Sequence, residues 1–153
     1  MFLRKNMTLL TILLLVILII SFTTSISAQE TVKIGIIQAL TGPNAMEGQN
    51  NLNACMLAIE IINGEFPDLA FDLAPTAGLP NLNGAKIEAV IGNSQGEPEF
   101  GAAETERLIT LSGVVAIEGA EFSGVTKTAS RVTERYKTPY IVGCSKRLQP
   151  SHH

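Results

Sequence analysis

The sequence predicts an α/β fold built on a doubly wound parallel sheet, and two observations support this prediction. Short runs rich in Val and Ile alternate three times with longer segments whose apolar residues recur every three or four positions. The short runs are largely apolar, as strands buried on both faces are. Because each right-handed crossover lays a helix on one face of the sheet, we expect the strand order 2-1-3-4.

The first repeat starts with the run Val32–Ala39, which the turn signal Gly42-Pro43 bounds. From about Met46 to Asn63 the apolar residues step by three and four along one helical stripe, made of Leu52, Cys55, Ile59 and Ile62. The segment 64–85 is too broken by Pro for a regular element and too apolar for a disordered linker. We expect an ordered surface excursion there that packs four apolar side chains onto the domain: Phe66, Leu69, Phe71 and Leu79.

The second repeat places a strand at Lys86–Ile91 and a helix that Pro98 opens as its first residue. Glu99 in the first turn of this helix is favourable to the helix dipole. The side that we expect to be buried consists of Phe100, Ala103, Leu108 and Leu111. Ser112 and Gly113 then close the second repeat.

The third repeat places a strand at Val114–Ile117 and a helix that begins near Ser123. Its expected buried side steps by four, three and four through Val125, Ala129, Val132 and Tyr136. Because the pair Thr138-Pro139 cannot continue a helix, we expect a fourth strand at Tyr140–Val142.

Residues 1–28 have the three parts of a secretory signal peptide. Arg4 and Lys5 are positive, Leu9–Phe22 is apolar, and Ile26–Ala28 is typical of a cleavage site. An uncleaved membrane anchor is the alternative, but the apolar stretch is shorter than the roughly 20 residues that span a bilayer. We therefore expect an exported protein, periplasmic or extracellular, whose single domain covers residues 29–153.

The charge and the cysteines exclude several kinds of partner. The chain carries 14 Asp and Glu against 11 Lys and Arg, so no basic surface for a nucleic acid is expected. Cys55 and Cys144 could form a disulfide in an oxidising compartment, but we expect two buried thiols instead. No spacing of Cys or His indicates a metal site, since His152 and His153 merely end the chain.

Ligands of a sheet with this order bind outside the carboxyl ends of its strands, where the order reverses. That crevice is expected between the loops Leu40–Asn44 and Gly119–Ser123. If Ser123 caps the following helix, its hydroxyl and the amide groups of Gly124, Val125 and Thr126 could hold a carboxylate or another small anion. A serine cap that serves only the helix is the alternative. Glu121 is either a solvated loop acid or a contact for an ammonium group.

Catalytic signatures are absent from the sequence. It has no G-x-S-x-G elbow, no G-x-G-x-x-G after the first strand and no P-loop. Because both histidines end the chain, no Ser-His pair can stand on a rigid element. We expect a binding protein without catalytic residues or a cofactor, with a small exported α/β enzyme as one alternative.

Three stretches, taken in order, carry a resemblance to a known family. They read VKIGIIQALTGPNAMEGQNNLNACMLAIEIIN, GAKIEAVIGNSQGEPEFGAAETERLI and VVAIEGAEFSGVTKTASRVTERYKTPYIVG. Each is similar to one of the first three units of the type I periplasmic solute-binding proteins, which serve ABC importers for branched-chain amino acids, amides and urea. The likeness runs from about Val32 to Ser145.

The resemblance implies the first lobe of a two-lobed protein that closes on a small polar solute and works with a membrane permease. It implies that Ser123 supplies a ligand hydroxyl, that Thr126 supports it one turn on, and that Cys144 and Ser145 offer main-chain groups and a hydroxyl. Glu47 stands where relatives commonly have an aromatic residue. A sensory domain of the same fold is the second alternative.

The tail 146–153 departs from the family's pattern, and the second lobe does not follow it. The resemblance therefore implies a truncated member of the family. A single lobe gives the crevice one wall, and such a site cannot enclose a ligand. We expect weak binding, or none, by this chain alone.

Overall fold

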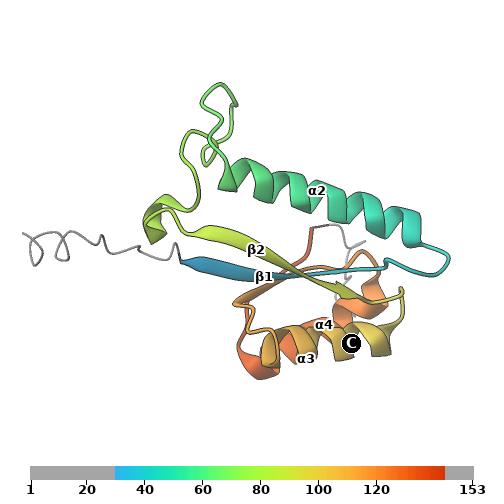
Figure 1. The fold of residues 1–153 in the computed structure, drawn as a ribbon. Helices are drawn as coiled ribbons and strands as arrows, with labels where there is room; N and C mark the ends of the chain where they lie inside the picture. The colour runs from blue at the N-terminus through green and yellow to red at the C-terminus, as the bar shows by residue number, and fades with distance from the viewer. Residues whose placement is uncertain (1–29, 144–153) are drawn as a thin grey trace, which may run out of the picture.

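The structure is a computed structural model that describes residues 30–143, and these residues form a parallel sheet with helices on both faces (Figure 1). The elements are β1 (Thr31–Gln38), α2 (Ala45–Asn63), the 3-10 turn η1 (Pro80–Leu82), β2 (Lys86–Asn93), α3 (Pro98–Thr110), β3 (Ala116–Gly119), α4 (Ser123–Tyr136) and β4 (Tyr140–Ile141). The expected signal peptide lies outside the described residues. No helix within residues 30–143 is long and apolar enough to cross a membrane.

The four strands lie in the order β2-β1-β3-β4, and every pair is parallel. This confirms the predicted fold class and strand order. Helix α2 lies over one face of the sheet, above β1 and β2, whereas α3 and α4 lie together on the opposite face (Figure 1). From β1 the chain adds β2 on one side, and it then crosses back to add β3 and β4 on the other. The point at which the strand order reverses therefore lies between β1 and β3.

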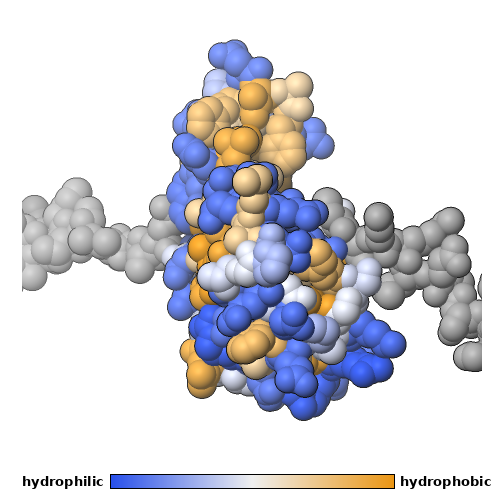
Figure 2. Space-filling model, turned by 90° about the vertical axis from the view of Figure 1, so that its right-hand side faces the viewer, coloured by the Kyte–Doolittle hydropathy of each residue, from blue (hydrophilic) through white to orange (hydrophobic). Residues whose placement is uncertain are grey.

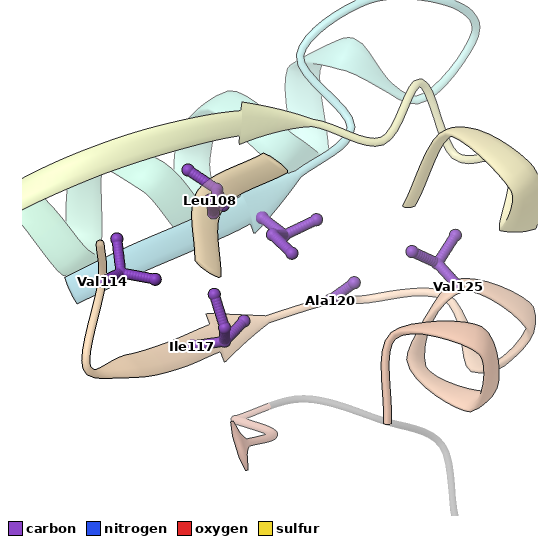
Figure 3. Close-up of a cluster of buried hydrophobic side chains, with 6 residues drawn as sticks. Leu108, Val114, Ile117, Ala120 and Val125 are labelled. Atoms are coloured by element: carbon purple, nitrogen blue, oxygen red, sulfur yellow. The ribbon is translucent and has the colours of Figure 1, made fainter. Parts of the chain in front are cut away.

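The main apolar core lies between the sheet and the pair α3 and α4. Side chains from β1, α3, β3 and α4 converge there, as Figure 3 shows. Leu108 and Ile117 are fully buried in this core, and so is Val125 from the first turn of α4. Its buried members are Ile37, Leu108, Val114, Ile117, Ala120 and Val125.

The buried side of α3 differs from the predicted one. Phe100 is 49% exposed and Leu111 is 80% exposed, whereas the helix buries Gly101, Thr105 and Leu108. The reason is the close packing of α3 on α4, because a Cβ at Gly101 would run into the side chain of Val125. Leu108 is buried as predicted, whereas Phe100, Ala103 and Leu111 are not, because hydrophobic periodicity does not detect the buried positions held by Gly and Thr.

Strand β3 starts two residues later than predicted, at Ala116 rather than Val114. The amide of Val114 donates to the Leu108 carbonyl at 3.2 Å, so Val114 belongs to the turn that follows α3. The strand then continues through Glu118 to Gly119, opposite Ile36 and Ile37 of β1. The pairing with β1, and not the apolar run alone, determines the bounds of this strand.

The segment 64–85 protrudes beyond the C-terminal end of α2 (Figure 1). Backbone bonds hold it, among them the one from the Gly78 amide to the Ile62 carbonyl at 2.7 Å. However, Phe66, Leu69 and Phe71 are 41–44% exposed, so the expected packing of these three side chains is wrong. Hydrophobic residues accordingly gather at the top of the view in Figure 2, at the height of this segment. Only Leu79 of the four is half-buried, beside its backbone bridge to Ala85.

Candidate functional site

Three loops meet at the carboxyl edge of the sheet, and side chains tie them to one another. The carboxylate of Glu121, after β3, accepts a hydrogen bond from the Ala39 amide, after β1, at 3.0 Å. The side chain of Asn93, at the end of β2, accepts from the Leu40 amide at 2.9 Å and donates to Thr41 Oγ1 at 2.9 Å. The loops at the predicted switch point are therefore held in one arrangement by polar side chains.

Glu121 is half-buried and hydrogen-bonded, so it is not a solvated loop acid, which was one of its two predicted roles. Its Oε1 is used on the Ala39 amide, and its Oε2 is buried without a hydrogen-bond partner among the described residues. The side chain thus cross-links the loops after β1 and β3 and keeps one acceptor unused. A buried acceptor without a donor costs free energy, so a ligand group that donates a hydrogen bond to Glu121 Oε2 would be favourable.

Ser123 is the first residue of α4, and Phe122 occupies the N-cap position without a side-chain capping bond. The prediction that Ser123 is the N-cap is therefore wrong by one residue, because the extended backbone continues through Phe122. Ser123 and Gly124 are both exposed at the carboxyl edge of the sheet. The Thr126 amide donates to the Phe122 carbonyl at 2.9 Å, so the expectation that this amide faces a ligand is also wrong. The amides before it lie at the positive end of the helix dipole.

Thr126 lies beneath the loop rather than on its surface. The residue is 2% exposed, and its hydroxyl is 2.9 Å from the Ala120 carbonyl oxygen and 3.0 Å from that of Phe122. The Tyr140 hydroxyl accepts a hydrogen bond from the Ala120 amide at 3.0 Å, and burial raises the pKa of Tyr140. Thr126 and Tyr140 therefore brace the loop 120–122 from below and position the start of α4.

Gly119 lets the loop after β3 approach β1 closely. Its φ of 117° lies in a region that L side chains rarely adopt, and a Cβ there would strike the Ile37 carbonyl oxygen. The glycine thus brings the 120–123 segment directly beside the end of β1. Of the other predicted site residues, Cys144 and Ser145 lie outside the described residues.

Two polar residues that the sequence reading passed over lie beside this edge. Gln38 ends β1 and Glu118 lies in β3, and the Gln38 amide nitrogen is 3.4 Å from Glu118 Oε2. The thiol of Cys55 on α2 donates to the same oxygen at 3.3 Å. The signal was available, since Gln38 and Glu118 are each the lone polar residue among the last apolar positions of a strand.

A pocket of about 130 Å³ opens between these residues and α2. Four of its lining residues have polar or ionisable side chains that the preceding paragraphs describe: Gln38, Cys55, Glu118 and Glu121. The others are Asn51, Ala54, Gly119, Ala120 and Gly143. Among the described residues no group of three or more His, Cys, Asp and Glu side chains is placed to hold a metal ion.

Comparisons with known proteins agree with this architecture. The family described as periplasmic binding protein matches residues 31–152. An ABC transporter substrate-binding protein of Sphaerobacter thermophilus is 25% identical, with a TM-score of 0.61 over 76% of this chain and 27% of its own. A branched-chain amino acid transporter substrate-binding protein of Streptococcus pneumoniae, in complex with isoleucine, is 24% identical, with a TM-score of 0.63 over 78% and 30%.

A solute-binding protein of an ABC transporter from Rhodopseudomonas palustris, in complex with 3,4-dihydroxybenzoic acid, is 24% identical, with a TM-score of 0.59. The matched region covers 75% of this chain and 27% of that protein. No curated protein matches the sequence significantly. The chain thus spans less than a third of the length of these three solved relatives. Since the family match extends over most of its residues, the chain belongs to the periplasmic binding protein family, whose members bind solutes outside the cytoplasm.

Proposed function

We propose that this chain supplies the first lobe of an extracytoplasmic solute-binding component of an ABC importer, and that its carboxyl edge contacts the carboxylate of a small solute. The observation that carries the proposal is the exposed start of α4 beside the loop after β1. Glu121 ties these two segments together through the Ala39 amide. Such an edge, at the switch point of a parallel sheet, is where doubly wound folds bind ligands.

The chemistry of this edge favours an anion at α4. Ser123 offers a hydroxyl, and the first amides of the helix lie at the positive end of its dipole. The ligands named for two of the structural relatives, isoleucine and 3,4-dihydroxybenzoic acid, share a carboxylate although their bodies differ. A carboxylate at Ser123 and Gly124 is therefore the common feature that we propose for the solute of this chain.

The remaining residues of the edge have supporting roles in this proposal. Thr126 positions the loop from below and Glu121 holds the two loops together. From the family resemblance, we propose that Cys144 and Ser145 contribute main-chain groups and a hydroxyl. Branched-chain amino acids are the first solutes to test, with amides, urea and aromatic acids next. The partner that we propose is an ABC permease in the membrane.

The proposal can be tested by following amide signals of the isotope-labelled chain by NMR while isoleucine or 3,4-dihydroxybenzoate is added. The amides of Ser123 and Gly124 and those of residues 40–42 should shift together, with saturation only at concentrations well above micromolar. Ser123→Ala removes one hydrogen bond to a charged group, so we expect it to weaken binding about tenfold. The control is Ser130→Ala, in the same helix, whose hydroxyl contacts the Lys127 carbonyl at 3.0 Å.

Two results would overturn the proposal. One is a set of shifted amides that excludes the start of α4 for every solute tested, because the edge would then not be the site. The other is an equal loss of affinity in the Ser123 and Ser130 variants, because a general weakening of α4 would then explain both.

A further inference from the structure

The pocket beside α2 lies on the opposite side of the sheet from the apolar core. Side chains alternate along a strand, so Gln38 and Glu118 face away from their neighbours Ile37 and Ile117, which belong to the core. Helix α2 lies mainly over β1 and β2 and covers β3 incompletely, since a pocket remains between Glu118 and the helix although the Cys55 thiol reaches Glu118 at 3.3 Å. Glu118 and the end of Gln38 therefore line a pocket instead of a packed layer.

Two acceptors in this pocket have no donor among the described residues. Gln38 is 3% exposed, yet its Oε1 has no hydrogen-bond partner within residues 30–143, and the same holds for Glu121 Oε2. Rotating the Gln38 side-chain amide by 180° would not satisfy its oxygen. The Gln38 nitrogen now lies 3.4 Å from Glu118 Oε2, and after the rotation the Gln38 oxygen would face that carboxylate oxygen instead. Each unsatisfied buried acceptor costs free energy, so an occupant that donates to both would stabilise the arrangement.

The charge of the pocket indicates what that occupant is. Glu118 and Glu121 line it, and the lining residues that the structure describes include no Lys or Arg. Burial raises the pKa of Glu118, and the neighbouring Glu121 adds to this, which is the condition of a carboxyl without a compensating cation. The hydrogen bonds from Cys55 and Gln38 offset only part of the burial.

We propose that this pocket binds a primary ammonium or guanidinium group, which donates to Gln38 Oε1 and Glu121 Oε2 and pairs with the Glu118 carboxylate. A group with several N–H donors suits acceptors that come from three different segments. The volume of about 130 Å³ admits a headgroup of a few heavy atoms and excludes a large body.

The inference goes beyond the proposed function and does not depend on it. The solute site at the start of α4 favours a carboxylate, whereas the pocket favours a cation, and the two share only Glu121. Methylammonium has no carboxylate, so its binding is decided by the pocket alone. Failure of one proposal therefore leaves the other standing.

The test is a titration of the isotope-labelled chain with methylammonium chloride at constant ionic strength, read by NMR. The side-chain amide signals of Gln38 and Asn51 and the backbone amide of Ala39 should shift with a saturable curve. Tetramethylammonium carries the same charge but no N–H donor, so it should leave these signals in place. Sodium chloride at equal concentration controls for screening.

A matched pair of variants distinguishes binding in the pocket from a general effect of the negative surface charge. Glu118→Gln keeps the shape and removes the charge, and we expect it to weaken methylammonium binding about tenfold or more. Glu88→Gln makes the same charge change at an exposed position of β2 and should leave the affinity as it is.

The cation could be a free amine or a side chain of the chain itself, because Lys146 and Arg147 follow Gly143 closely in the sequence. The double variant Lys146→Ala, Arg147→Ala distinguishes these sources. Methylammonium binding in the wild type supports a free amine, and binding only in the double variant supports an intramolecular cation. The proposal is overturned if neither protein responds to methylammonium, because water would then be the occupant. It is also overturned if tetramethylammonium shifts the same signals as methylammonium, or if Glu88→Gln weakens binding as much as Glu118→Gln.

Discussion

The two sides of strands β1 and β3 are occupied by opposite chemistry. On one side Ile37 and Ile117 are fully buried among the side chains of α3 and α4. On the other, Gln38 and Glu118 lie one residue away along the same strands and line a pocket with unused acceptors. The difference follows from the helices, because α3 and α4 pack on one side of these strands, whereas α2 on the other side lies mainly over β1 and β2 and leaves a pocket beside Glu118 of β3. A parallel strand is apolar on both faces only where both faces are covered.

The apolar side should give the largest effect on stability. Leu108 is fully buried in the core, so Leu108→Ala should lower the free energy of unfolding by about 3 kcal/mol. Leu111 was predicted from the sequence to share that side but is 80% exposed, so Leu111→Ala should change it by less than about 0.5 kcal/mol. Urea unfolding of both variants decides the phase of α3. Equal losses would contradict the observed packing.

The approach of α2 to the end of β1 should give the next largest effect. Gly48 is buried, and a Cβ there would collide with the Ala39 backbone. Alanine normally stabilises a helix relative to glycine by about 1 kcal/mol. Gly48→Ala should instead destabilise the chain by about 2 kcal/mol, because α2 must move away from the loop. Asn50→Ala, exposed in the same helix, is the control, and a gain in stability from Gly48→Ala would refute the close approach.

The polar side should reveal itself through pH. Burial is the main reason that the pKa of Glu118 lies above its ordinary value of 4.5, with Cys55 and Gln38 opposing and Glu121 reinforcing the shift. The folded state therefore binds this proton more tightly than the unfolded state, so stability falls as pH rises through the interval from 4.5 to the raised value. Tyr140, across the sheet, remains protonated in this range, because its own pKa is raised above 10.0.

Glu118→Gln should remove this part of the pH dependence. We expect its free energy of unfolding to exceed that of the wild type above the interval and to match it more closely below. Glu88→Gln is the control of equal charge change. Denaturant unfolding at a series of pH values makes the measurement, and a wild-type slope that persists in Glu118→Gln would show that another group titrates.

The start of α4 should give the smallest change in stability. Because Ser123 is the exposed first residue of α4 and Phe122 occupies the N-cap position, Ser123→Ala should alter the free energy of unfolding by less than about 0.5 kcal/mol. A serine N-cap would cost about 1 kcal/mol instead. Thermal unfolding distinguishes the two, and the larger loss would restore the capping role that the sequence predicted.

The sequence was sufficient to predict the order of the strands and the end of the sheet where the loops meet. Both depend on the alternation of apolar runs with helical stripes, which Val32–Ala39 and Met46–Asn63 display clearly. It was insufficient where small residues decide the packing. Gly101 and Gly48 mark close approaches of helices to their neighbours, yet they carry no hydrophobic signal.

The candidate site was predictable only in part, for a related reason. The position of the crevice follows from topology, but the roles of its residues depend on contacts across more than 50 residues of sequence, such as Glu121 with Ala39 and Leu40 with Asn93. The reading of the strands as apolar concealed Gln38 and Glu118. A single polar residue at the end of a buried strand needs a hydrogen-bond partner or a pocket, so Gln38 and Glu118 could have been read as signs of a polar site.

One pair of titrations tests most directly the central claim, that the ends of β1 and β3 serve two sites of opposite charge preference. The labelled chain receives 3,4-dihydroxybenzoate, which has no ammonium group, and separately methylammonium, which has no carboxylate. We predict that the first shifts the amides of Ser123 and Gly124, and that the second shifts the side-chain signals of Gln38 and Asn51. Identical shifts from both compounds, or the reverse assignment, would contradict the claim.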